Sequence, residues 1–318
     1  MGNRYRCAGT TSETYINGVM TNDRVDIRSL FLPTRCIENA ACFAELNNKI
    51  YIANMTDYPA SESYIYTFDG DEFERVVTFP LTEVQDICNY NNTIYFCDNI
   101  DLYRIDGDTV TAVTTIPEND GRNEYRLFSL GQYMYLLESR YPNSTYDPIV
   151  NNKIYRFSGS GWTQVLEFSG ILRYPNCILF RGVIHIISCT LYPSAVGPDY
   201  WMRSDIHKTF NGVSLSDSPV YPGERLKRNA TYIYDNKIRA FEGNVDETNI
   251  AGKAWDFDGN NWTSDNLLTF DKWVNGEEFN RSGFQAFAVK GKQFVFNVRA
   301  CMMMEISNPI RLSQYFVS

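Results

Sequence analysis

The chain of 318 residues repeats one pattern of short strands several times along its length. The stretch "NNKIYRFSGSGWTQVLEF", residues 151–168, places two apolar runs on either side of a glycine-containing turn, and similar stretches occur at residues 64–80, 102–117 and 254–270. The runs alternate with a period of two, which is typical of strands with one buried face, and Asp-Gly between such runs indicates a tight turn. Each stretch is therefore predicted to be a β-hairpin.

A second hairpin precedes these stretches and carries the repeat through the whole chain. Its second strand contains an apolar anchor residue, and successive anchors are 40 to 56 residues apart. The six anchors are Ile50, Ile94, Met134, Ile184, Ile238 and Phe294. Four-stranded units of about 40 to 50 residues are typical of β-propellers, whose sheets stand around a channel. The sequence therefore predicts an all-β fold: a six-bladed β-propeller with four-stranded antiparallel blades.

We expect residues 1–318 to form a single domain, because a blade is not stable without its neighbours. The predicted repeat units cover, in order, residues 41–80, 84–117, 126–168, 176–222, 228–270 and 284–315. The last unit supplies two or three strands, whereas residues 13–33 end in the apolar-then-proline manner of a unit's outer strand. Residues 1–33 are therefore expected to close the ring, with residues 13–33 pairing with the sheet of residues 284–315.

Composition supports a large folded core and excludes two classes of partner. Hydrophobic residues make up 44% of the chain and aromatic residues 15%, which suits half-buried strands. The net charge is −9 and the basic residues are scattered, so we expect no binding to nucleic acid. The longest apolar stretch, residues 177–189, is interrupted by Arg181 and His185 and is shorter than the roughly 20 residues of a membrane span. We therefore expect no membrane insertion, and the first residues lack the apolar segment of a secretion signal.

The eight cysteines form no C-x-x-C pair, which removes the common zinc and redox signatures. Cys88 and Cys97 fall on neighbouring strands of one predicted hairpin, as Cys177 and Cys189 do in another, so each pair is a candidate for a cross-strand disulfide. We favour the alternative, in which they are small buried thiols in a reducing cytoplasm. Six N-x-S/T sequons are attributed to a chain rich in Asn and Thr. They begin at Asn54, Asn91, Asn143, Asn229, Asn261 and Asn280.

The sequence lacks the recognisable equipment of a propeller enzyme, so we predict no catalytic residue, no cofactor and no metal site. His185 lies within an apolar strand and is interpreted as a hydrogen-bonded core residue, and His207 has no evident His or Cys partner at metal-ligand spacing. Sialidase-type Asp boxes have Asp two positions before Gly, whereas Asp69, Asp106 and Asp258 directly precede Gly and are explained by turn chemistry. We therefore expect a protein that is not an enzyme.

The four-strand unit resembles the repeat of Kelch-like β-propellers across nearly the whole chain, with "IY" in the second strand, "YRF-x-G" in the third and Trp after the turn. It departs from that pattern after the second strand, where Asn54, Asp98 and Glu138 stand in place of a double glycine. Short units rich in Asn, Tyr and Thr also resemble the Kelch-like proteins of bacteriophages, whose propellers occur in tail, nozzle and baseplate parts. The resemblance implies a structural component of a virion, assembled in the host cytoplasm.

Three hypotheses about function follow from these observations. The leading one is a non-enzymatic tail or portal-associated virion propeller that contacts other virion or scaffold proteins, or a receptor or glycan on the host surface. The first alternative is a Kelch-like adaptor of the cytoplasm. The second alternative is a glycan-binding or glycan-acting propeller.

A Tyr-Pro pair that recurs seven or eight residues after the anchor in three units marks the expected binding surface. In a propeller these segments join the second strand of a blade to its third. Proline fixes the backbone there, and Tyr presents a broad amphipathic surface at little entropic cost; the alternative is that each Tyr covers the edge of a neighbouring blade. The candidate binding residues are Tyr58, Arg140, Tyr141, Tyr146, Tyr192, Tyr200, Trp201 and Arg203.

Overall fold

In the described part of the chain, the regular secondary structure consists of β-strands alone. The computed structural model describes residues 4–6, 10–12, 27–31, 35–36, 41–56, 62–80, 82–117, 123–140, 151–170, 172–193, 200–223, 226, 229–241, 252–270, 273–274, 277–278, 285–297 and 302–306. Across these ranges no helix reaches the length and apolarity that a membrane crossing requires.

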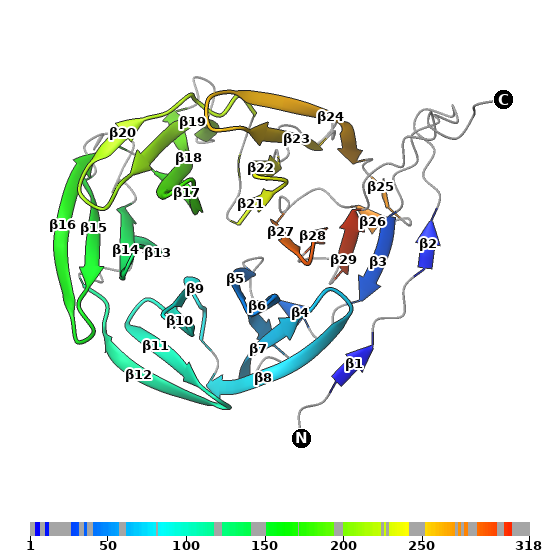
Figure 1. Ribbon diagram of the computed structural model, residues 1–318, viewed down its shortest axis with the longest axis horizontal. Helices are drawn as coiled ribbons and strands as arrows, with labels where there is room; N and C mark the ends of the chain where they lie inside the picture. Colours follow the sequence, from blue (N-terminus) through cyan, green and yellow to red (C-terminus); the bar gives the residue numbers. More distant parts are fainter. Residues whose placement is uncertain are drawn as a thin grey trace.

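Five four-stranded antiparallel sheets stand around a common centre as the blades of a β-propeller, which agrees with the predicted fold class (Figure 1). In each blade the strands run in chain order from the innermost to the outermost. Blade 1 contains β5 (Cys42–Leu46), β6 (Lys49–Thr56), β7 (Glu62–Phe68) and β8 (Glu72–Pro80). Blade 2 contains β9 (Asp86–Tyr90), β10 (Thr93–Cys97), β11 (Asp101–Asp106) and β12 (Thr109–Thr115).

The other three blades have the same order of strands. Blade 3 contains β13 (Asn123–Leu130), β14 (Tyr133–Arg140), β15 (Asn151–Phe157) and β16 (Trp162–Ser169). Blade 4 contains β17 (Arg173–Phe180), β18 (Val183–Pro193), β19 (Tyr200–Phe210) and β20 (Leu215–Asp217). Blade 5 contains β21 (Thr231–Tyr234), β22 (Lys237–Phe241), β23 (Gly252–Phe257) and β24 (Trp262–Phe270).

A further sheet, which we call the terminal sheet, combines strands from the two ends of the chain. Its order is β27 (Gln285–Val289), β28 (Lys292–Asn297), β29 (Met302–Ile306), β3 (Ile27–Phe31) and β2 (Thr10–Ser12). Met302 lies opposite Phe31 and Ile306 opposite Ile27, in antiparallel register. Within residues 13–33, the segment 27–31 therefore pairs with the C-terminal sheet as expected, and residues 13–26 lie outside the described residues.

Four short strands lie outside this plan. β4 (Arg35–Cys36) pairs with the end of β6, and β1 (Arg4–Arg6) pairs with the outer strand β8. β25 (Trp273–Val274) and β26 (Glu277–Glu278) pair only with each other in the part of the chain that the structure describes. Blade 1 thus carries β1 as an added strand on its outer edge, next to β8 (Figure 1).

Left-handed turns join the innermost strand of each sheet to its second strand. In five of the six turns both residues have positive φ, as a two-residue turn that follows the natural twist of a hairpin requires. These pairs are Asn47-Asn48, Asn91-Asn92, Arg181-Gly182, Asp235-Asn236 and Lys290-Gly291. In blade 3 the turn begins with Gly131 at φ 60°. Asn, Asp and Gly tolerate this conformation best, so the repeated turn residues fix the register of each inner hairpin.

Side chains also hold the outer hairpin turns of two blades. The carboxylate of Asp69 accepts the backbone N–H groups of Asp71 and Glu72 at 3.0 and 2.9 Å. Asp258 accepts those of Asn260 and Asn261 at 2.8 and 2.9 Å. Asp69 and Asp258 therefore act in turn formation, as the sequence indicated, whereas the carboxylate of Asp106 accepts from Arg104 and Thr111.

Aromatic and aliphatic clusters fill four of the interfaces between consecutive blades, and a fifth cluster joins blade 1 to the terminal sheet. In this fifth cluster Phe68 lies edge-on to Phe294 with ring centroids 4.9 Å apart, and Phe287 packs in the same cluster. Between blades 1 and 2, Phe79 lies against Phe96 at 5.2 Å. Such contacts bury both faces of a blade, and apolar burial of this kind stabilises the fold by about 25 cal/mol per Å².

A buried polar network occupies the interface between blade 5 and the terminal sheet. The guanidinium of Arg239 donates to both carboxylate oxygens of Asp256, at 2.7 and 2.8 Å. It also donates to Gln293 Oε1 at 2.8 Å, and the hydroxyl of Tyr232 donates to the same oxygen at 2.7 Å. Burial raises the pKa of the Tyr232 hydroxyl, so this group remains a neutral donor. We call these four residues the polar seam.

We predict that Arg239→Met destabilises the protein by about 3 kcal/mol, because it leaves the buried carboxylate of Asp256 and the oxygen of Gln293 without their main donor. The free energy of unfolding can be measured with urea. The control is Lys208→Met, which removes an exposed ion pair with Asp217 and should leave the unfolding midpoint unchanged. Equal effects of the two substitutions would contradict a role for the polar seam.

Candidate binding site

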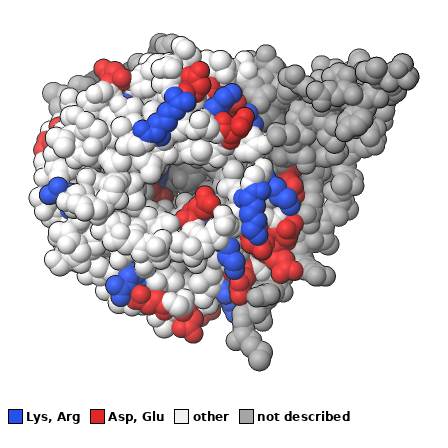
Figure 2. Space-filling view, in the orientation of Figure 1, with Lys and Arg blue, Asp and Glu red and all other residues white. Residues whose placement is uncertain are grey.

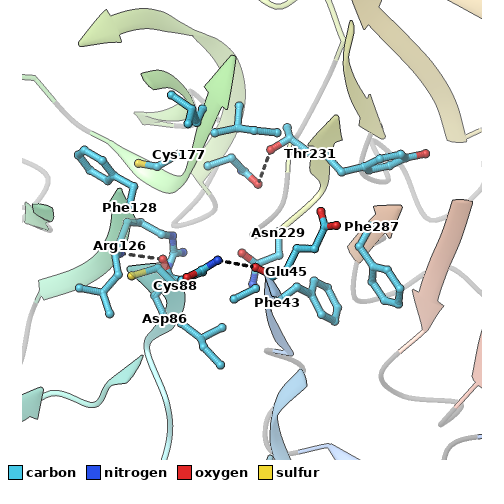
Figure 3. Close-up of a pocket in the computed structure, with 18 of the residues that line it drawn as sticks. Phe43, Glu45, Asp86, Cys88, Arg126, Phe128, Cys177, Asn229, Thr231 and Phe287 are labelled. Carbon is cyan, nitrogen blue, oxygen red and sulfur yellow. Dashed lines mark hydrogen bonds between the residues drawn. The ribbon is translucent and has the colours of Figure 1, made fainter. Parts of the chain in front are cut away.

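A cavity of about 440 Å³ lies at the centre of the ring, and Figure 2 shows the hollow at this position. Most of the residues that line it come from the innermost strands of the five blades and of the terminal sheet, namely β5, β9, β13, β17, β21 and β27. Figure 3 shows labelled side chains from all six of these segments around the cavity. The cavity is therefore the place where all the repeat units meet.

Hydrogen bonds between neighbouring sheets surround the cavity where the innermost strands begin. The Arg126 side chain donates to the carbonyl of Gln85 in the segment before blade 2, at 3.0 Å, and to that of Pro175 in blade 4, at 2.6 Å. Asp86 accepts the N–H of Leu127 at 2.8 Å. These bonds join blades 2, 3 and 4.

Hydrogen bonds at the same level of the channel join the remaining sheets. Asn176 accepts the N–H of Ala230 at 3.0 Å, which links blade 4 to blade 5. Asn229 accepts the N–H of Ala286 at its backbone carbonyl, and its side chain donates to the carbonyl of Ala41 at 2.6 Å. The N–H of Ala41 in turn donates to Gln285 at 3.1 Å. Further along, the Cys42 thiol faces the Gln85 carbonyl at 3.5 Å. We call the whole set the inter-blade ring.

The position where Kelch repeats carry a double glycine contributes similar polar links. Asn54, at φ 64°, exchanges two hydrogen bonds of 2.7 Å with the backbone of Val84, which connects blade 1 to blade 2. Asp98 accepts the N–H groups of Ile100 and Asp101 at the turn within blade 2. Asn54 and Asp98, which stand in place of the double glycine, therefore bind backbone groups.

Further along the innermost strands, the wall of the cavity is polar on one side and apolar on the other. Asn89 donates to the carbonyl of Glu45 at 3.1 Å, and the Ser129 hydroxyl donates to the carbonyl of Asn89 at 2.5 Å. The equivalent positions of blades 4 and 5 hold Leu179 and Ile233, which are 49% and 38% exposed. The open part of the cavity thus offers hydroxyl and amide groups opposite an apolar wall, an arrangement suited to small amphipathic molecules.

The two thiols that line the cavity are unreactive. Cys88 and Cys177 are free, and burial raises the pKa of both, so that they remain protonated at neutral pH. Cys88 lies opposite Tyr95 and not opposite Cys97, which is also free. The disulfide alternative between Cys88 and Cys97 is therefore wrong in this structure, because the hairpin register offsets the two residues.

Two charged residues of the cavity wall, Arg126 and Asp86, serve as structural links, whereas Glu45 also lines the cavity and is exposed. Arg126, 1% exposed, donates to backbone carbonyls of three segments, the third being Tyr125 at 2.8 Å. Asp86 holds a backbone N–H of the next blade. Charge-assisted bonds of this kind orient the strands around the channel. The arrangement is that of a rigid frame around a small cavity.

The structure places the candidate binding residues in three different situations. Tyr58, Tyr141 and Tyr146 lie outside the described residues. Arg140 is the last residue of β14, opposite Asn123. The other four lie on the β18–β19 hairpin of blade 4: Tyr192, Tyr200, Trp201 and Arg203.

The expectation that these four residues lie in a loop is wrong. β18 and β19 each run for 11 residues, and after an irregularity between Ser188 and Thr190 the ladder continues. Tyr192 is opposite Trp201, and Arg203 is opposite Thr190. β-Branched and aromatic residues favour strands. The threonine and aromatic residues of this segment could therefore have indicated an extended hairpin.

Sequence analysis did not identify the inter-blade ring. Asp86, Arg126 and Asn176 stand eight residues before Ile94, Met134 and Ile184, the anchors of their units. An alignment of the units on their anchors would have shown a polar residue at this position in three of the six units, where the other three have Cys42, Ala230 and Ala286.

Comparison with known proteins shows the fold of the chain but does not assign the chain to a family. No family model matches the chain, and no curated protein matches its sequence. Among solved structures, the chain is similar to the α-L-arabinofuranosidase Arb93A of Fusarium graminearum, with a TM-score of 0.55, 8% identity, and coverage of 98% of this chain and 99% of that chain. It is also similar to the Aleuria aurantia lectin AAL, with a TM-score of 0.50, 11% identity, and coverage of 83% and 90%. These similarities establish a β-propeller fold.

The two histidines of the chain form a buried pair away from the cavity. His185 Nδ1 and His207 Nε2 are 2.8 Å apart, which confirms His185 as a hydrogen-bonded core residue. His207 Nδ1–H donates to the carbonyl of Pro219, 2.7 Å away, so its Nε2 accepts a hydrogen bond from His185 Nδ1–H. Both rings pack against Phe257. The bond between the two histidines requires a neutral His207, because protonation of its Nε2 would place two N–H groups against each other.

We predict that acid destabilises the protein through this pair. Burial lowers the pKa of both imidazoles to about 4, whereas in the unfolded chain they bind protons below about pH 6.5. Between these values the unfolded state binds more protons, so stability is greatest above pH 6.5 and falls as the pH decreases towards 4, by about 3 kcal/mol for each histidine and on the order of 6 kcal/mol for the pair.

Urea unfolding at pH values from 7 to 4 measures this loss. His185→Asn keeps a donor for His207 and removes one titrating group, so the fall in stability over this range should be smaller than in the unaltered protein. Equal slopes for the two proteins would contradict the assignment, because carboxylates titrate identically in both.

Proposed function

We propose that the protein is a non-catalytic interaction scaffold, with the extended β18–β19 hairpin of blade 4 as its main contact surface. The observation that carries this proposal is the ladder beyond Ser188, where Thr190–Pro193 pairs with Tyr200–Arg203. Within the described residues of blades 1 to 4, it adds strand length to one blade only, since the other second strands have eight residues or fewer. Tyr, Trp and Arg, which it carries, are enriched in protein interfaces.

The buried polar groups of the channel form hydrogen bonds that hold the blades together, which supports the proposal of a scaffold. Arg126, Asp86 and Asn176 bind backbone groups of neighbouring blades, and Glu138 accepts from Asn123 and Tyr155 within blade 3. Groups committed to such bonds hold the ring in one shape. A rigid frame lowers the entropic cost of presenting a contact surface.

The proposed context is a virion, where the propeller contacts other structural proteins or a receptor on the host surface. Its support is the resemblance of the short Asn-, Tyr- and Thr-rich units to phage propellers. A cytoplasmic Kelch-like adaptor is the alternative context, and it would use the same hairpin surface.

Carbohydrate binding is the second candidate function, and the cavity is the observation that favours it. Its wall sets Asn89 and Ser129 opposite Leu179 and Ile233, so hydroxyls and apolar C–H faces could both find partners. Two of the similar propellers, an arabinofuranosidase and a lectin, are named for carbohydrates. A labelled glycan panel tests this candidate, since binding without hydrolysis would support it.

We also propose that the terminal sheet is the sixth blade and closes the ring. The pairing of β3 with β29 and the bonds of Ala286 and Gln285 in the inter-blade ring support this proposal. The strand from the N-terminal segment would then cover an edge that β29 alone would leave open.

Partner attachment is expected to depend on the hairpin surface. The variant Tyr192→Ala, Tyr200→Ala, Trp201→Ala should retain its fold and should be missing from particles purified from the producing cells, because interface aromatics contribute most of the binding energy. The matched control is Ile100→Ala, Val213→Ala, Val220→Ala, which truncates three exposed side chains elsewhere and should leave attachment unchanged. Absence of the unaltered protein from particles would contradict the virion context, and retention of the variant would contradict the hairpin surface.

Ring closure is expected to depend on β3. Removal of residues 1–33 should lower the melting temperature sharply or cause aggregation, because the edge of β29 loses its partner. The control is removal of residues 1–6, which deletes β1 and leaves β2 and β3 in place. Closure by β3 would be refuted if the two truncated chains melted alike.

A further inference from the structure

The outer strand of blade 2, β12, has an unpaired edge in the part of the chain that the structure describes. It ends the sheet order β9, β10, β11, β12, and it lies on the rim of the ring in Figure 1. Thr109, Thr111, Ala112 and Thr115 are exposed. An edge strand offers backbone N–H and C=O groups to any strand that can reach it.

β12 contains none of the charged or proline residues that usually protect such an edge, although its pairing with β11 shifts register at Val113. Its sequence, "TVTAVTT", contains no charge, no proline and no glycine, and six of its seven residues are β-branched, which favours further strand pairing. The other long outer strands differ. β8 is paired with β1, β16 carries Glu167 and β24 carries Asp265, while β20 has only three residues.

The edge of β12 is held in place by its blade. Val110 packs against the cluster between blades 1 and 2, and Val113 packs against the cluster between blades 2 and 3. Asp106, at the start of the turn, accepts from Arg104 at 2.8 Å and from Thr111 at 3.2 Å. A pre-organised strand loses little entropy when another strand joins it.

Blade 1 shows that an outer edge of this ring accepts an added strand. β1 lies antiparallel to β8, with Arg4 opposite Glu74 and Arg6 opposite Glu72. Opposite charges across a ladder favour such pairing and like charges oppose it. A strand that joins β12 has to match an uncharged, threonine-rich edge instead.

We propose that the partner of β12 is β12 of a second copy of this chain, paired antiparallel about a two-fold axis at Ala112. In this register Val110 lies opposite Thr114, Thr111 opposite Val113, and Thr109 opposite Thr115. No charged residue of either strand enters the ladder, so the edge is complementary to itself, as an isologous contact requires. The proposal goes beyond the proposed partner surface and is independent of blade 4.

The rest of the molecule sets the conditions of this dimer. Each chain carries a net charge of −9, so two copies repel each other at low ionic strength, and added salt screens that repulsion. We expect the dimer to be weak and to strengthen with salt, because a single edge contact buries little area.

Sedimentation velocity of the full chain from about 1 µM to about 1 mM tests the proposal. The unaltered protein should change from monomer to dimer in this range. Ala112→Lys and Ala112→Glu each place like charges opposite each other at the two-fold axis, so each should raise the dissociation constant at least about tenfold. A mixture of the two variants should dimerise again, because the charges are then opposite.

The control is Thr163→Lys, which introduces the same charge at an exposed position of the outer strand β16. It should dimerise like the unaltered protein, and melting curves should show that all variants are folded. A monomer at every concentration overturns the proposal and leaves the edge to a strand of another protein. A dimer that resists both Ala112 substitutions overturns it as well, because the contact then lies elsewhere.

Discussion

Hydrogen bonds between neighbouring sheets at the start of the innermost strands are the interactions on which the rest of this ring depends. Arg126 binds carbonyls on both of its sides, Asp86 and Asn176 each hold a backbone N–H of the next blade, and Gln285 joins the terminal sheet to Ala41. A buried polar group left without a partner costs about 1–3 kcal/mol. Each sheet therefore has one orientation that its neighbours satisfy, and the cavity takes its shape from that condition.

Two kinds of interface hold the sheets outside the channel. Aromatic clusters such as Phe68 with Phe294 bury area without strict directional demands. The polar seam of Arg239, Asp256, Gln293 and Tyr232 is directional, since four hydrogen bonds meet in fixed geometry. This directional interface adjoins the sheet that contains both ends of the chain, so its geometry helps to place strands that come from distant parts of the sequence.

The function proposed for the protein is consistent with this division of roles. The carboxylate of Glu138 helps to hold the frame, because it accepts hydrogen bonds from Asn123 and Tyr155. The surfaces left for recognition are the extended hairpin of blade 4 and the outer edges of the blades. In such a molecule the core determines the shape, and the residues at the periphery determine which partners bind.

The sequence by itself determined the strands, the hairpins and the propeller class, because these depend on local periodicity and on turn residues such as Asn47-Asn48 and Asp258. Only the tertiary structure decided which polar residues meet. His185 and His207 are joined by a hydrogen bond across neighbouring strands, and Arg126 and Pro175 lie 49 residues apart in the chain. The exposed edge of β12 was likewise outside the reach of the sequence. Burial and pairing depend on neighbours that a local pattern does not specify.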